Sequence, residues 1–159
     1  MKPKQFLSLC TLLLCIGAMR VQAQTEIPFK LDFEQESSQW LFANDSVNQW
    51  VRGNKAHNGD ESQYGLYISN TQGASNKYEG YQPQVSHAYF LVQVPQGGAL
   101  LEFDYRLQGE GDEYYGVSDG LKVSIVDTAQ KPVAGFGMPI ADGQYVRQTS
   151  WTTAQLPVD

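Results

Sequence analysis

The stretch ALLEFDYRL, residues 99–107, decides the fold class. Apolar and charged side chains alternate along it: Leu101, Phe103, Tyr105 and Leu107 against Glu102, Asp104 and Arg106. A period of two places successive side chains on opposite faces of a β-strand, so we expect one buried face and one wet face. A second apolar run, residues 88–94, is separated from it by Pro95-Gln96-Gly97-Gly98, which predicts a hairpin.

Shorter segments on both sides carry strand and turn signals. We expect strands at residues 29–33, 64–69, 121–125, 133–138 and 151–156, and short strands between Trp40 and Trp50. Trp40, Trp50 and Trp151 are expected in the core, where aromatic side chains bury the largest area. No apolar 3.6-residue period persists for three turns after residue 23. The pattern predicts an all-β domain, a two-sheet antiparallel β-sandwich of the jelly-roll type.

The first 23 residues have the order of a secretory signal. Lys2 and Lys4 precede an apolar run from Phe6 to Met19, and Val21-Gln22-Ala23 offers a cleavage site. This run is shorter than the roughly 20 residues that an α-helix needs to cross a bilayer. We therefore expect a signal peptide at 1–23, a single domain at 24–159 and no membrane-spanning segment in the mature chain. Both cysteines lie in the signal, which excludes a disulfide framework or thiolate site after cleavage.

The charge of the mature chain limits its partners. The signal holds three of the 11 Lys and Arg residues and none of the 17 Asp and Glu residues, leaving eight against 17 and a net charge of −9. Such a surface repels phosphate backbones and anionic headgroups, which argues against nucleic acid and bare membranes. Cations and neutral sugars remain suitable partners.

Carboxylates gather in the Gly-rich segment 109–120. Glu110, Asp112 and Asp119 lie there with Glu113, and clustered carboxylates with carbonyl oxygens suit calcium, which takes six to eight oxygen ligands. The spacing does not match an EF-hand loop. A solvated acidic loop is the alternative interpretation.

Catalytic motifs are missing from the sequence. No Gly-x-Ser-x-Gly element occurs, and His57 and His87, the two histidines, lack zinc-ligand spacing. Asp104 with Glu102 or Glu110 would offer the carboxylate pair of a glycosidase, but any acidic strand face offers such pairs. We expect a protein that is not an enzyme.

Aromatic residues in expected loops are the candidates for ligand contact. A flat ring can cover the C–H face of a sugar, and the loop tyrosines are Tyr78, Tyr81, Tyr114 and Tyr115. Packing within the domain is the alternative role for these rings.

Several short motifs follow one another over residues 29–126: Asp32-Phe33-Glu34, Trp50 with Gly53, Tyr64 to Asn70, Ser86 to Tyr89, Leu101 to Tyr105, Gly109-Glu110 and Asp119 to Val123. Their order resembles the choice-of-anchor J and cleaved-adhesin domains, relatives of the MAM-like jelly rolls. The resemblance implies a non-catalytic accessory module in secreted or cell-surface proteins of Gram-negative bacteria, on the outer surface or in the periplasm. It also implies adhesion, glycan or protein contact, and sometimes calcium, with Asp32 or Glu34 as a further ligand.

One departure from the resemblance concerns the end of the sequence. In similar domains a Trp-led strand such as 151–156 is followed by another strand pair, so we expect the last strands to be missing and an edge to be exposed. The functional expectation is an exported binding or adhesion module for an extracellular glycan or protein, and the resemblance implies a structural calcium ion. The alternatives are an accessory domain or fragment of a secreted glycosidase or peptidase, and a purely structural piece.

Overall fold

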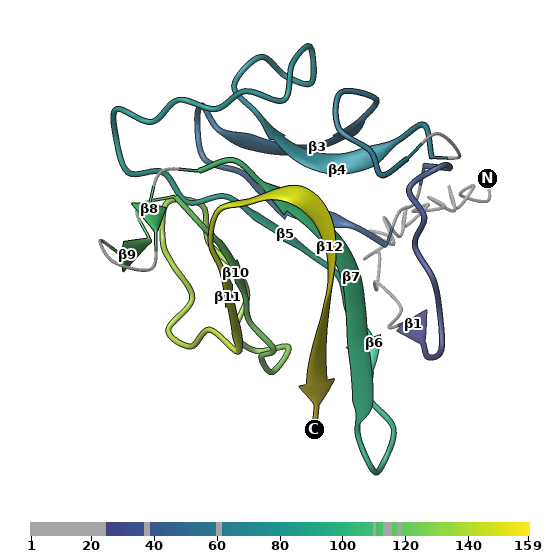
Figure 1. Ribbon diagram of the computed structural model, residues 1–159. Coiled ribbons are helices and arrows are strands. Elements are labelled where there is room, and N and C mark those ends of the chain that lie inside the picture. Colours follow the sequence, from purple (N-terminus) through teal and green to yellow (C-terminus); the bar gives the residue numbers. More distant parts are fainter. Residues whose placement is uncertain (1–24, 37–38, 60–61, 110, 113–115, 118) are drawn as a thin grey trace, which may run out of the picture.

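The computed structural model describes residues 25–159 except 37–38, 60–61, 110, 113–115 and 118 (Figure 1). Every regular element in this described part is a strand, which confirms the all-β prediction. The strands are β1 (Thr25–Glu26), β2 (Leu41–Ala43), β3 (Gln49–Gly53), β4 (Gly65–Ser69), β5 (His87–Tyr89), β6 (Val92–Gln93), β7 (Ala99–Leu107), β8 (Gly111–Asp112), β9 (Gly116–Val117), β10 (Leu121–Val123), β11 (Gly143–Tyr145) and β12 (Gln148–Val158).

The longest ladder joins β7 to β12 in antiparallel register, with Ala154 opposite Phe103 and a bulge between Gln148 and Thr152. As predicted, the side chains of β7 alternate between half-buried and exposed. On the inner face, the rings of Phe103 and Tyr105 lie 5.4 and 4.8 Å from the ring of Tyr145 in β11. The β10–β11 pair therefore packs against this face, and β3 and β4 lie across one end of the ladder (Figure 1).

The predicted hairpin between residues 88–94 and 99–107 is wrong, although its turn forms. Gly98 N donates to Pro95 O at 3.1 Å, with Gly97 and Gly98 at positive φ. The first run is divided into β5, which pairs with β2, and β6, which pairs in parallel with β1. Phe90, between them, packs with its ring centre 4.9 Å from that of Trp40.

Two other predicted strands are not formed. Residues 29–33 keep the alternation of half-buried and exposed side chains but pair with no strand among the described residues. Phe33 has φ 64°, which ends the extended conformation in a turn. Residues 133–138 contain a turn at Gly135, and Phe136 is 71% exposed. Their apolar side chains therefore gain no buried face to pack on.

The tryptophans are not fully buried, contrary to the prediction of core positions. Trp151 lies on the outer face of β12, where the Arg106 guanidinium is 5.3 Å from its ring centre. Trp40 and Trp50 are half-buried. The buried apolar residues in the described part are Tyr67, Ala154 and Val158. The core is thin, and much of the packing is between aromatic rings that remain partly exposed.

Candidate functional site

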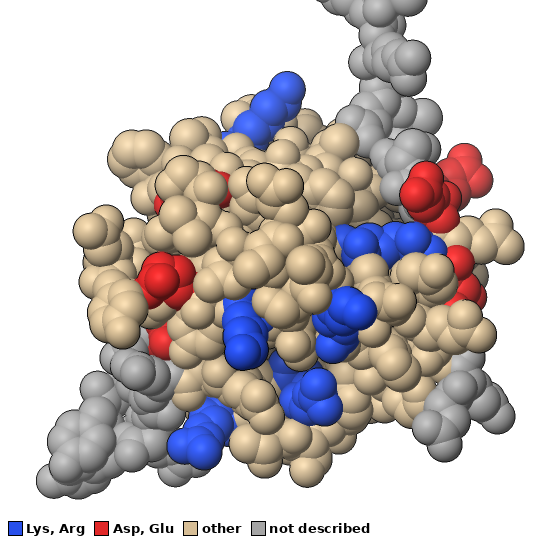
Figure 2. All heavy atoms as spheres, turned by 90° about the horizontal axis from the view of Figure 1, so that it is seen from above, with Lys and Arg blue, Asp and Glu red and all other residues tan. Residues whose placement is uncertain are grey.

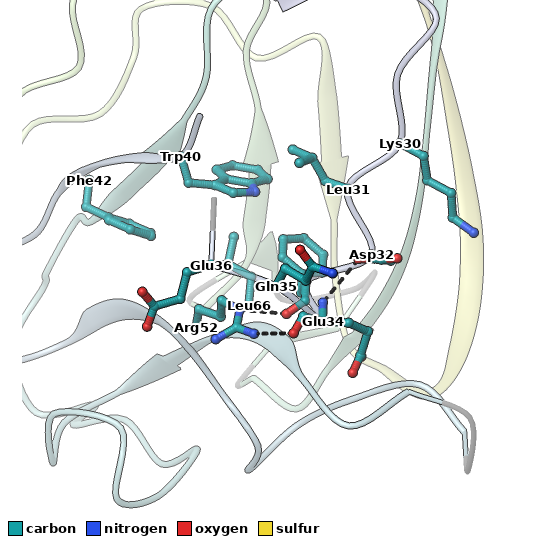
Figure 3. A pocket seen from close by; sticks show the side chains of 11 residues that line it. Lys30, Leu31, Asp32, Glu34, Gln35, Glu36, Trp40, Phe42, Arg52 and Leu66 are labelled. Atoms are coloured by element: carbon teal, nitrogen blue, oxygen red, sulfur yellow. Dashed lines mark hydrogen bonds between the residues drawn. The ribbon is translucent and has the colours of Figure 1, made fainter. Parts of the chain in front are cut away.

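A cavity of about 540 Å³ lies between the N-terminal segment and strands β2, β3 and β4 (Figure 3). Residues 30–36 form one side, and Trp40, Phe42, Arg52 and Leu66 complete the lining. We call it the Glu34 pocket. It combines aromatic rings with carboxylates, an amide and two cations, which is the composition of a site for a polar organic ligand.

The turn that borders the pocket is fixed by Arg52 of β3. The Arg52 Nε donates to the Phe33 carbonyl at 2.6 Å, and its Nη2 donates to the Glu34 carbonyl at 2.8 Å. Between these contacts Phe33 adopts a left-handed φ of 64°, which costs a bulky L-residue about 1–2 kcal/mol. Backbone strain of this kind persists only where the surroundings enforce it, and it is concentrated at functional sites.

The Glu34 carboxylate ties this turn to the segment before β4. Its Oε1 accepts hydrogen bonds from Ser62 Oγ at 3.0 Å, Gln63 N at 2.9 Å and Tyr64 N at 3.1 Å. Burial raises the pKa of Glu34, but these bonds and the Arg52 charge outweigh it, so the pKa lies below its ordinary value. Glu34 therefore remains an anion that anchors the turn through one oxygen.

Several side chains on the open side of the pocket are exposed to solvent. Phe42 is 43% exposed, and Asp32, Gln35 and Glu36 are exposed. Figure 3 shows Trp40 and Phe42 along one wall, with Glu36 and Gln35 opposite them. Exposed aromatic and polar side chains thus lie beside a turn whose backbone is held by the Arg52 hydrogen bonds.

The structure places a tyrosine predicted to contact a ligand beside a carboxylate predicted to bind calcium. The Tyr78 hydroxyl donates to Asp119 Oδ2 at 2.7 Å, which joins the 70–80 loop to the end of the acidic segment. Tyr78 is 37% exposed, and Tyr81 is 94% exposed. Tyr114, Tyr115 and Glu110 lie outside the described residues, as does the Asp112 side chain. The role of these tyrosines in ligand contact stays a prediction.

The predicted calcium site also stays a prediction. Within the described residues, no group of three or more His, Cys, Asp or Glu side chains is arranged to hold a metal ion. Glu34 and Asp119 each bond to neutral protein donors. The same described part contains no helix long and apolar enough to cross a membrane.

The carboxylates considered for hydrolysis are held by neutral donors on the outer face of β7. Asp104 accepts from Asn58 Nδ2 at 2.8 Å and from Thr153 Oγ1 at 2.6 Å. Glu102 accepts from Gln155 Nε2 at 2.6 Å. Both carboxylates thus belong to cross-strand hydrogen bonding, which accounts for their positions without a reaction.

Sequence reasoning missed most of the Glu34 pocket. The pattern of residues 40–50 predicts core positions for Trp40 and Phe42, and Arg52 carries no signal for a site. The available signal was the Asp32-Phe33-Glu34 motif, whose carbonyls are bonded by an arginine 18 and 19 residues further on. Contacts between residues so far apart in the sequence leave no pattern that can be recognised in either segment.

Comparison with known proteins does not assign the chain to a family. No family model matches it, and neither a curated protein nor a solved structure shows significant similarity.

Proposed function

We propose that the mature chain is an exported, non-catalytic jelly-roll module that binds an extracellular glycan in the Glu34 pocket. The observation that carries this proposal is the 43% exposure of Phe42 on the wall of a pocket whose other wall is polar. An exposed ring covers the C–H face of a sugar, while carboxylate and amide groups accept and donate hydrogen bonds to its hydroxyls.

The ordered backbone of the pocket supports binding of a rigid polar ligand. Arg52 and Glu34 fix the turn at residues 32–35 through five hydrogen bonds, so little conformational entropy is lost when a ligand binds. The export signal places the module where glycans are abundant. The resemblance to cleaved-adhesin domains favours the same class of function.

The charge distribution is compatible with a neutral glycan. On the face seen in Figure 2, Lys and Arg side chains are spread between uncharged residues, and acidic side chains lie toward the sides. No uniform acidic field covers this face. The Glu34 pocket itself is lined by Asp32, Glu34 and Glu36, which favours an uncharged glycan there.

A glycan array followed by calorimetry on the best ligand tests the proposal. Phe42→Ala should weaken binding about tenfold or more, which corresponds to roughly 1.4 kcal/mol, because the sugar loses its apolar platform. Phe136→Ala is the matched control, since Phe136 is an exposed phenylalanine outside the pocket. It should leave affinity unchanged.

Two outcomes would contradict the proposal. If no glycan binds and a pull-down instead recovers a protein ligand, the module contacts protein. If a glycan binds equally well to the wild type and to Phe42→Ala, the site is elsewhere. Melting curves of both variants establish that any loss reflects the pocket and not unfolding.

A further inference from the structure

The Glu34 pocket contains a buried hydrogen-bond donor with nothing to bond. The indole Nε1 of Trp40 is shielded from solvent and has no hydrogen-bond partner. The other tryptophan of this region differs: Trp50 Nε1 donates to the Ser86 carbonyl at 3.0 Å. The described residues contain one other such atom, the Asn70 Oδ1, which is an acceptor. An unpaired buried donor is destabilising and native structures satisfy nearly all such groups, so a donor in the wall of a pocket points to a ligand acceptor.

The surroundings of this donor define what that acceptor should be. The Trp40 ring packs against Phe33 and Phe90, with centroid distances of 5.8 and 4.9 Å. Figure 3 shows its nitrogen on the side of the ring toward Leu31 and Gln35. The site is therefore an N–H beside aromatic rings, in a pocket whose lining also includes the exposed amide side chain of Gln35.

We infer that the Glu34 pocket recognises an N-acetylated sugar, whose acetamido carbonyl accepts the Trp40 Nε1 hydrogen. This inference rests on the proposed glycan-binding function. An amide carbonyl is a strong neutral acceptor, and the methyl group beside it matches the apolar surroundings. A hydroxyl in the same place has no methyl group to pack against the apolar side chains, and a carboxylate would face Asp32 and Glu36 at the rim.

A matched pair of ligands tests the specificity. Oligomers of N-acetylglucosamine and of glucose with the same linkage differ in having an acetamido group or a hydroxyl at C2. The wild type should bind the acetylated oligomer at least about tenfold more tightly, because its acetamido carbonyl is the stronger acceptor for the buried donor and its methyl group packs on the apolar side chains. Trp40→Phe should reduce this preference to near one, whereas Trp50→Phe should retain it.

Stability without ligand supplies an independent measurement. Both Trp→Phe changes remove the same ring volume, but only Trp50→Phe also breaks a hydrogen bond. The melting temperature should therefore fall further for Trp50→Phe than for Trp40→Phe. Equal falls would show that the Trp40 N–H is paired and would overturn the inference.

The ligand results separate this inference from the proposed function. Tight binding of both oligomers with no preference, or a preference that survives Trp40→Phe, would overturn the N-acetyl specificity while leaving glycan binding in place. Absence of binding to every glycan of the array would remove both.

Discussion

Gly53 and Gly65 stand opposite each other at one end of the β3–β4 pair, and neither has room for a side chain. A Cβ at Gly65 would lie closer than 3.0 Å to the backbone carbonyl oxygen of Ala56. A Cβ at Gly53 would overlap the Tyr67 hydroxyl. The two obstacles differ, because a carbonyl is held by the chain and a hydroxyl ends a side chain.

This difference sets the expected magnitudes. Overpacking costs about 1–3 kcal/mol, and Gly65→Ala should reach the upper end, about 3 kcal/mol, since backbone must move. That loss lowers the melting temperature of a domain of this size by roughly 10 °C. Tyr67 is 6% exposed and donates to the Gly73 carbonyl at 2.9 Å, so its displacement in Gly53→Ala costs about 1–2 kcal/mol.

Thermal and urea unfolding followed by circular dichroism measure these changes. Gly137→Ala is the control, because a Cβ there meets nothing within 4 Å, and it should melt with the wild type. Tyr67→Phe removes the obstructing hydroxyl, so adding it to Gly53→Ala should cost less than the sum of the two single changes. When Tyr67→Phe is added to Gly65→Ala, the two losses of stability should simply add, because the atoms nearest to a Cβ at Gly65 belong to Ala56 and His57. Equal rescue of both glycine variants, or a wild-type melt for Gly65→Ala, would refute the geometry.

Three further predictions concern pH and metal. The lowered pKa of Glu34 means that its stabilisation is complete above its ordinary pKa of 4.5 and is lost as pH falls through the folded-state value, so Glu34→Gln should flatten the acid limb of the stability curve. Burial, and secondarily the nearby Tyr105, raise the pKa of Tyr145 above 10.0; stability should therefore fall above pH 10.0, and Tyr145→Phe should remove that part of the loss in alkaline melts. If the segment 109–120 binds calcium, the ion should raise the melting temperature and EGTA should reverse the rise, whereas identical melts would exclude a native-state site.

The fold class was predictable because it depends on local alternation, and strand pairing was not because it depends on distant partners. Residues 99–107 form β7 with the expected faces. The turn at Pro95 to Gly98 also forms, yet β7 pairs with β12, whose residues lie more than 40 positions away. A turn brings two segments near each other, but the ladder that forms is the one whose apolar faces match over the greatest length.

The candidate site shows the same division. The resemblance pointed to Asp32 and Glu34 only as calcium ligands, although the alternation at residues 29–33 did indicate which side chains turn inward. What could not be predicted is that this segment pairs with no strand of the described part and is instead held by Arg52. The positive φ of Phe33 follows from that tertiary contact and has no signature in the residue itself.

The thin core and the proposed binding site have a common origin. Trp40 packs against Phe33 and Phe90, and Phe90 packs 5.6 Å from Phe29, so one chain of rings joins the pocket to the N-terminal segment. These rings remain half-buried beside the cavity, and the turn at Phe33 that borders it is fixed by polar contacts from Arg52. Partly exposed apolar surface is what a sugar ring would pack on, so in the proposed function the incomplete burial of this region belongs to the site.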